Sequence, residues 1–233
     1  MELALLTQEA VPFLLRWLHF LAGITWIGLL YYFNFVQVPF MAEADAAVKP
    51  HVVRKLAPRA LWWFRWGAML TFLTGFVYLI WGAAHGSGMG TPWMNTISIG
   101  ATLGTLMFLN VWLIIWPKQK VVIASAEAVA AGGQADPNAA EAGNRAFLAS
   151  RTNTFFSIPM LFFMGAASHL TTAGLGPSNA GVGLCTALIM AVEANAIWGK
   201  KGQGPSKMLD KHVAVIHAGL GFALVLYLIA ELL

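Results

Sequence analysis

The chain has 233 residues, of which 58% are hydrophobic and only 10% are charged, and its mean hydropathy is +0.68. This composition excludes an ordinary soluble domain and indicates an integral membrane protein. The formal net charge of +4 follows from basic loops beside a membrane and gives no reason to expect a nucleic-acid partner.

Six apolar stretches are long enough to cross the hydrocarbon core, about 30 Å thick, which takes roughly 20 helical residues. They cover residues 12–36, 61–83, 95–116, 147–172, 178–198 and 212–232. The sequence therefore predicts an all-α fold: a polytopic membrane bundle of six transmembrane helices, forming one domain over residues 1–233. The first stretch is expected to remain in the mature chain, because it is longer than the apolar core of a signal peptide and no basic segment precedes it.

Basic residues predict the orientation of this bundle. Three connections between the predicted helices are basic: the first has Lys49, Arg54, Lys55, Arg59 and Arg65, the third Lys118, Lys120, Arg145 and Arg151, and the fifth Lys200, Lys201, Lys207 and Lys211. The other two, GAAHGSGMGTPWMN and TAGLGPSNAG, carry no charge. By the positive-inside rule the basic loops face the cytoplasm and both termini face the periplasm of a bacterial inner membrane. Residues 42–60 and 118–131 are expected to include short interfacial helices in these loops.

Three histidines, His19, His85 and His169, fall in the outer half of the predicted bundle or at its boundary. Two neutral imidazoles at one depth on facing helices can hold a haem iron from both sides. His19 and His169 are the predicted iron ligands, with His85 as a substitute for either. Gly23 and Gly165 lie one turn from these two histidines, where small residues let a flat macrocycle approach the backbone. The alternative is that the histidines only form hydrogen bonds between helices.

A second polar set falls in the inner half of the bundle and comprises Asn34, Asn110, Arg151, Asn153, Glu193, Asn195 and His217. Arg151 and Glu193 are placed to form a buried ion pair, with the asparagines satisfying the remaining donors and acceptors. Three interpretations stay open: a packing clamp, a proton pathway or quinone headgroup site with Glu193 or His217 as the proton carrier, and a second haem at His217. A buried ionisable group in a membrane costs about 2.5–3.5 kcal/mol on insertion scales, so each should have a partner or a use.

Other chemistries have no support in the sequence. Cys185 is the only cysteine, which excludes an internal disulfide, cysteine-rich zinc sites and covalently attached c-type haem. GxSxG, HExxH and Walker motifs are absent, and no catalytic residue is assigned from the sequence.

Four stretches carry a family resemblance: WLHFLAGITWIGLLYYFNFVQVPF, FLNVWLIIWPKQK, ASRTNTFFSIPMLFFMGAASHL and VEANAIWG. The chain resembles the membrane domain of the bacterial cytochrome c-linked urate oxidases. The resemblance implies a membrane unit that passes electrons from an oxidation reaction toward c-type cytochrome and the respiratory chain. Family members carry a cytochrome c domain behind the membrane region; here the sequence stops at Leu233 without a CxxCH motif, so a separate cytochrome subunit is expected.

The sequence thus favours a haem b-binding membrane subunit of an oxidoreductase, with c-type cytochrome, another respiratory subunit or quinone as its electron partner. Urate as a substrate rests on the resemblance alone. The alternative is a cofactor-free anchoring or assembly subunit, or a small transporter.

Overall fold

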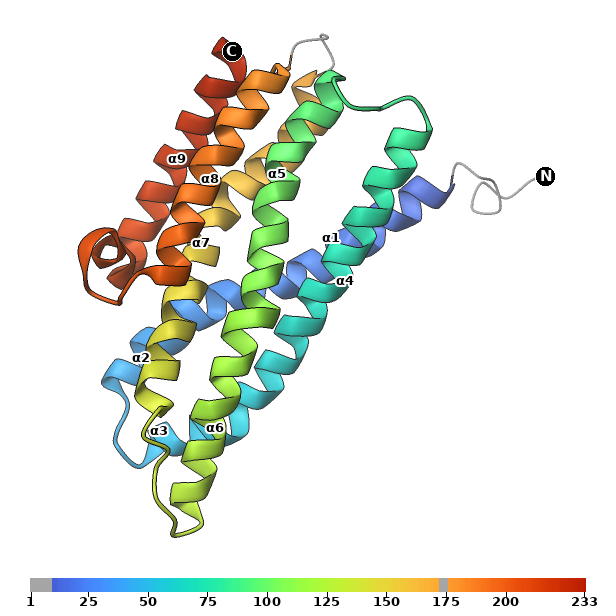
Figure 1. Ribbon diagram of the computed structural model, residues 1–233. Coiled ribbons are helices and arrows are strands. Elements are labelled where there is room, and N and C mark those ends of the chain that lie inside the picture. The colour runs from blue at the N-terminus through green and yellow to red at the C-terminus, as the bar shows by residue number, and fades with distance from the viewer. Residues whose placement is uncertain (1–9, 172–175) are drawn as a thin grey trace, which may run out of the picture.

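The computed structural model describes residues 10–171 and 176–233, and in this part of the chain all regular structure is helical (Figure 1). The first half forms three long helical runs, each made of an α-helix, a π-helical segment and a further α-helix. They are α1 (Ala10–Tyr31), η2 (Tyr32–Gln37) and α2 (Val38–Glu43); α3 (Val48–His51), η3 (Val52–Leu56) and α4 (Ala57–Ala84); and α5 (Pro92–Leu109), η4 (Asn110–Ile115) and α6 (Trp116–Ala130). The second half contains α7 (Ala139–His169), α8 (Asn179–Trp198), the 3-10 helix η6 (Gly204–Asp210) and α9 (His212–Leu232).

Each π-helical segment is followed by proline at the second residue of the next helix: Pro39, Pro58 and Pro117. A proline inside a helix has no N–H to donate, and its ring clashes with the carbonyl one turn earlier. In all three places the residue before the proline donates its N–H to the carbonyl five residues back. The helix therefore absorbs the proline by widening one turn, and it continues without a sharp break.

This continuity changes one prediction. The helices expected as separate interfacial elements within residues 42–60 and 118–131 are extensions of the apolar helices, because α3 continues into α4 and α5 continues into α6. The helical pattern after Lys118 ends at Ala130, one residue before the predicted end at Ala131.

Five helical runs are long and apolar enough to cross a membrane: Ala10–Glu43, Val48–Ala84, Pro92–Ala130, Asn179–Trp198 and His212–Leu232. They contain five of the six predicted spans, apart from one residue at the start of the fifth. The remaining predicted span, 147–172, corresponds to α7. This helix is not among the runs that are apolar enough, by composition alone, to cross a membrane. Residue 172, the last of the predicted span, lies outside the described part. Spanning by α7 and the orientation of the bundle therefore stay predictions.

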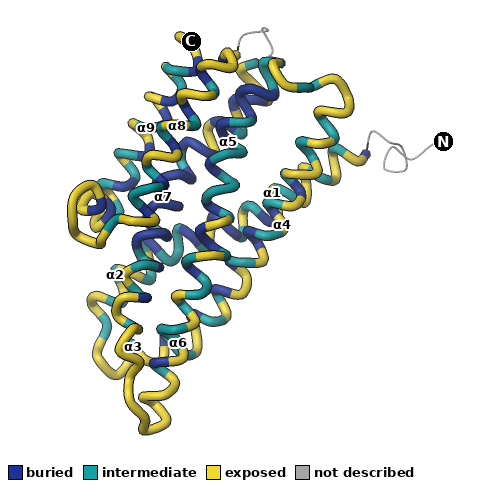
Figure 2. Tube along the Cα trace, viewed as in Figure 1, coloured by how far each residue is buried: buried dark blue, intermediate teal, exposed yellow. Residues whose placement is uncertain are grey.

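Helix α7 is the centre of the bundle, and this explains its polar composition. All seven residues from Arg151 to Ser157 are buried, so protein surrounds the helix on every side at this level (Figure 2). It packs against α5, α6, α8 and α9. Gly219 of α9 makes the closest of these approaches, since an added Cβ there would lie 3.1 Å from the carbonyl oxygen of Phe155.

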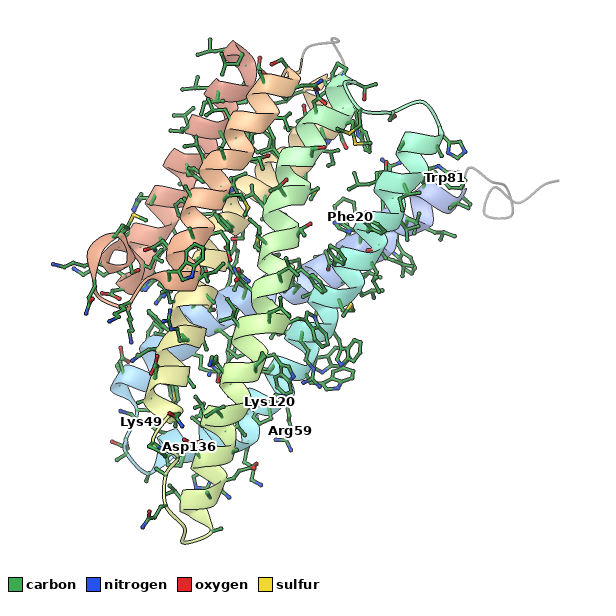
Figure 3. The ribbon with its side chains drawn as sticks, in the orientation of Figure 1. Phe20, Lys49, Arg59, Trp81, Lys120 and Asp136 are labelled. Atoms are coloured by element: carbon green, nitrogen blue, oxygen red, sulfur yellow. The ribbon has the colours of Figure 1, made fainter. Side chains whose placement is uncertain are left out.

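Charged side chains gather at one end of the molecule. Lys49, Arg59, Lys120 and Asp136 lie near the end formed by α3 and α6, whereas Phe20 and Trp81 lie toward the other end (Figure 3). Figure 1 also shows α1 and α4 as a pair that is set apart from α5, α7, α8 and α9 at this second end.

Candidate functional site

His19 of α1 sits against α4. Its Nδ1 lies 3.2 Å from Oγ1 of Thr74, and its ring covers Gly75, where an added Cβ would lie only 2.9 Å from Cε1 of the imidazole. The glycine at position 75 is therefore what lets the ring approach the backbone of α4. Gly23, which the sequence predicts to lie beside a flat macrocycle, has a methyl carbon of Thr71 as the nearest atom to an added Cβ, at 3.9 Å.

The hydrogen bonds of Thr74 determine which nitrogen of His19 carries the proton. A threonine hydroxyl has one hydrogen, and Thr74 donates it to backbone carbonyls of its own helix, at 2.7 Å to Leu70 and 3.1 Å to Thr71. With its hydrogen so placed, Oγ1 acts as an acceptor toward His19, which assigns the ring hydrogen to Nδ1. Nε2 is left with its lone pair, which is the form of imidazole that binds iron, with its other nitrogen oriented by an acceptor. His19 thus fits the role of a haem ligand.

The structure does not bring His169 to the same place. α1 contacts α7 at the C-terminal end of α1, where the hydroxyls of Tyr31 and Ser157 lie 2.9 Å apart. His19 and His169 each lie roughly 18 Å farther along their own helix, at about 1.5 Å per residue. The outer parts of α1 and α7 diverge, so equal distances along the two helices do not bring these histidines together (Figure 1). His169 is exposed at the last residue of α7.

The two other residues of the predicted outer site also lie apart from His19. His85 is exposed beyond the end of α4, where its Nδ1 is 2.8 Å from the carbonyl of Trp81 and its ring stacks on that indole at 4.1 Å. Gly165 is exposed, and an added Cβ there would meet nothing within 4 Å. A bis-histidine site is therefore not assembled in this structure, while His19 alone has the surroundings of a ligand.

A shallow groove of about 320 Å³ lies along α5 and is lined by small or hydroxyl side chains. The lining residues are Ser98, Ala101, Thr102, Thr105 and Leu106. α4 and α5 contact each other at two points, one beyond each end of the groove. The rings of Phe72 and Phe108 stack with centroids 4.3 Å apart, and the ring centroids of Tyr78 and Trp93 are 6.0 Å apart. His19 contacts α4 between these two points, so the groove and the histidine lie at one level of α4.

Asn110, Asn153 and Glu193 of the inner polar set form a hydrogen-bonded network across three helical runs. Nδ2 of Asn110 donates to Oδ1 of Asn153 at 2.9 Å and to the carboxyl group of Glu193 at 3.1 Å. Asn153 donates in turn to the carbonyl of Met107 at 2.9 Å. This carbonyl lies in the last turn of α5, just before η4, and it also accepts the backbone N–H of Asn110.

The ion pair expected between Arg151 and Glu193 is not formed. Arg151 is only 1% exposed, yet its Nε and one terminal nitrogen, NH1, have no hydrogen-bond partner within the described residues. The guanidinium instead lies 5.1 Å from the ring of Phe147 and interacts electrostatically with Asp210 of η6. Arg151 is therefore a buried cation with donors to spare.

The other predicted members of the inner polar set lie apart from this network. Asn195 accepts from Ser206 at 3.1 Å and ties η6 to the end of α8. His217 is exposed on α9 and bonds only the carbonyl of Val213 at 3.0 Å, so the structure does not join it to the network. Asn34 is buried but belongs to a different place, since it donates to Leu30 and to Ser150 of α7.

Sequence reasoning missed Thr74 and Gly75, the residues that seat His19, and Arg145, which donates to the carbonyls of Ile197 and Gly199 at the end of α8. It also missed the three π-helical segments. A proline inside a sequence that otherwise reads as one continuous helix is the signal that could have predicted them. It occurs at Pro39, Pro58 and Pro117.

The fold and these sites define the class: an α-helical membrane bundle with a buried polar layer around its central helix. Residues 92–227 match the urate oxidase N-terminal family, and the chain belongs to that family. The match includes three of the four stretches that carried the resemblance, while the stretch around His19 lies before it. Neither the curated proteins nor the solved structures contain a match to this chain.

Proposed function

We propose that this chain is a haem b-carrying membrane subunit of a urate oxidase-type oxidoreductase in a bacterial inner membrane. It would pass electrons from the oxidation reaction toward a c-type cytochrome outside the membrane. Membership of the urate oxidase N-terminal family supports the oxidoreductase class, and the five apolar helical runs support the membrane location.

The observation that carries the haem proposal is the contact between Nδ1 of His19 and Oγ1 of Thr74, which favours the tautomer with its hydrogen at Nδ1. Thr74 holds the hydrogen of the imidazole at Nδ1, which leaves Nε2 as a ligand. The sequence places the second ligand at His169; the outer parts of α1 and α7 diverge in this structure, so these parts would have to approach each other for the two histidines to hold one haem. When bound, haem would supply one-electron transfer. The task of this chain's residues is to orient the His19 ring and to shield it from water within the bundle.

A reduced-minus-oxidised spectrum of the purified protein tests this proposal. A b-type α-band after dithionite reduction is expected, and His19→Ala should abolish it. His169→Ala tests the second ligand separately: loss of the band supports the pair, and an unchanged band replaces His169 by another ligand. A colourless, iron-free preparation would overturn the proposal.

Thr74 is a positioning residue in this proposal. Thr74→Val keeps the shape of the side chain but removes the acceptor, so the haem midpoint potential and the α-band position should shift; Thr74→Ser should restore both. Thr71→Val is the matched control, since the hydroxyl of Thr71 donates only to the carbonyl of Gly67 in its own helix, at 2.7 Å. If both valine variants keep the parent spectrum and potential, Thr74 does not orient a ligand.

A cofactor-free anchoring or assembly subunit is the rival function. It is favoured by the contact that His19 makes with Thr74, which could serve solely to join α1 to α4. Iron and pigment analysis of the same preparation separates the two functions.

A further inference from the structure

A cavity of about 200 Å³ lies between η2, α4, η4, α6 and α7, apart from both sites described above. Its walls combine three phenyl rings with four uncharged polar side chains. The rings are Phe33, Phe64 and Phe147, and the polar side chains are Asn34, Gln37, Gln119 and Ser150.

The π-helical segments converge on this cavity. η2 contributes Phe33, Asn34 and Gln37, η4 contributes Ile115, and η3 ends immediately before the lining residue Ala57. π-helical turns are uncommon and occur frequently at functional sites. Two of them contribute to the wall of this cavity and the third ends beside it, which indicates that the widened turns shape a binding space.

Polar groups in the wall have unused hydrogen-bonding capacity. Oε1 of Gln37 is buried without a partner, and its amide makes no hydrogen bond within the described residues. Asn34 donates both of its amide hydrogens, one to the carbonyl of Leu30 and one to the hydroxyl of Ser150. Ser150 therefore acts as an acceptor toward Asn34 and keeps its own hydrogen for another group. The cavity thus offers a ligand at least one hydroxyl donor and one amide.

The size of the cavity and the lack of charge in its wall limit the classes of ligand that it can bind. A cavity of about 150 Å³ is known to bind benzene, so this cavity holds one substituted ring and is too small for a macrocycle. None of the lining residues is charged, which favours a neutral ligand over an anion such as urate. An amide can donate to a carbonyl in one orientation and accept from a hydroxyl in the other, so Gln37 suits a ring that occurs in both forms.

The cavity also reaches the apolar surface. Val38 lines it and is 36% exposed, and the neighbouring Val36 and Leu56 are 56% and 44% exposed. A ligand with a hydrocarbon tail could place its ring in the cavity and leave the tail along this surface in the lipid.

We propose that the cavity between η2, η4 and α7 binds the headgroup of a quinone. The inference deepens the proposed function by naming a lipid-soluble electron carrier as a ligand of the same subunit. It moves the predicted quinone site away from Glu193 and His217, neither of which lines the cavity.

Titration of the full-length protein in lipid nanodiscs with decylubiquinone tests the proposal. Saturable binding to the parent is expected. Gln37→Leu should raise the dissociation constant about tenfold, in line with the loss of one buried hydrogen bond. Ala146→Phe should abolish binding by filling the cavity. Ser157→Ala, outside the cavity, should bind as the parent does. Unchanged binding in Gln37→Leu and in Ala146→Phe would overturn the proposal.

Two further measurements locate and identify the ligand. An azido-substituted ubiquinone should label peptides from η2 or from residues 143–150 of α7, and labelling confined to other helices would contradict the site. Urate should not displace decylubiquinone; competitive displacement would replace the quinone by the substrate. Binding to the His19→Ala variant separates this inference from the haem proposal, because the cavity should bind quinone even when haem is lost.

Discussion

Nδ2 of Asn110 lies 3.1 Å from the carboxyl group of Glu193, and the same amide nitrogen donates to Asn153. One side chain from the junction of α5 and η4 thus satisfies polar groups of α7 and α8. This arrangement is a clamp that fixes the order of three helices, and it needs no charge on Arg151.

Asn110→Leu should therefore destabilise the fold by about 1–3 kcal/mol, because it leaves Glu193 and Asn153 buried without their donor. Unfolding of the detergent-solubilised protein by added SDS, followed by circular dichroism, measures the change. Asn179→Leu is the control, since Asn179 accepts from Asn95 at the start of α8, away from this network. Equal stability of Asn110→Leu and the parent would contradict the clamp.

Arg151 gives the opposite expectation. Arg151→Met removes the desolvation cost of a buried charge, and its electrostatic partner Asp210 is exposed and stays solvated, so the free energy of unfolding should stay unchanged or rise by about 1 kcal/mol. The same SDS titration measures it. A loss of more than about 2 kcal/mol would mean that Arg151 has a structural partner after all.

Gly75→Ala should disturb the seat of His19. Its Cβ would lie 2.9 Å from Cε1 and 3.2 Å from Nδ1 of the imidazole, so the ring must shift away from Thr74. We expect a loss of about 1–3 kcal/mol in stability and a reduced haem content in absorbance spectra.

Gly28→Ala is the matched control for Gly75→Ala, because an added Cβ there meets nothing within 4 Å. Alanine is also the better helix former, so this variant should be at least as stable as the parent. Identical behaviour of the two variants would show that Gly75 does not seat the ring.

Gly219→Ala should weaken the contact between α9 and the central helix. An added Cβ would lie 2.6 Å from Cδ1 of Ile158 and 3.1 Å from the carbonyl oxygen of Phe155, and the backbone oxygen cannot move aside. A decrease of about 1–3 kcal/mol in unfolding free energy is expected. Gly221→Ala, with open space around it, should show no decrease; a decrease in both would point to helix flexibility instead of packing.

Hydropathy and charge in the sequence determined the membrane class and five of the spans, and they predicted a depth for each polar residue, because these depend on position along a helix. Depth does not say which neighbour a side chain faces. The tertiary structure decided that His19 faces Thr74 and Gly75, that Asn110 and not Arg151 holds Glu193, and that His217 faces outward. These outcomes depend on how each helix is rotated and tilted against the others, which is set by close packing at residues such as Gly75 and Gly219.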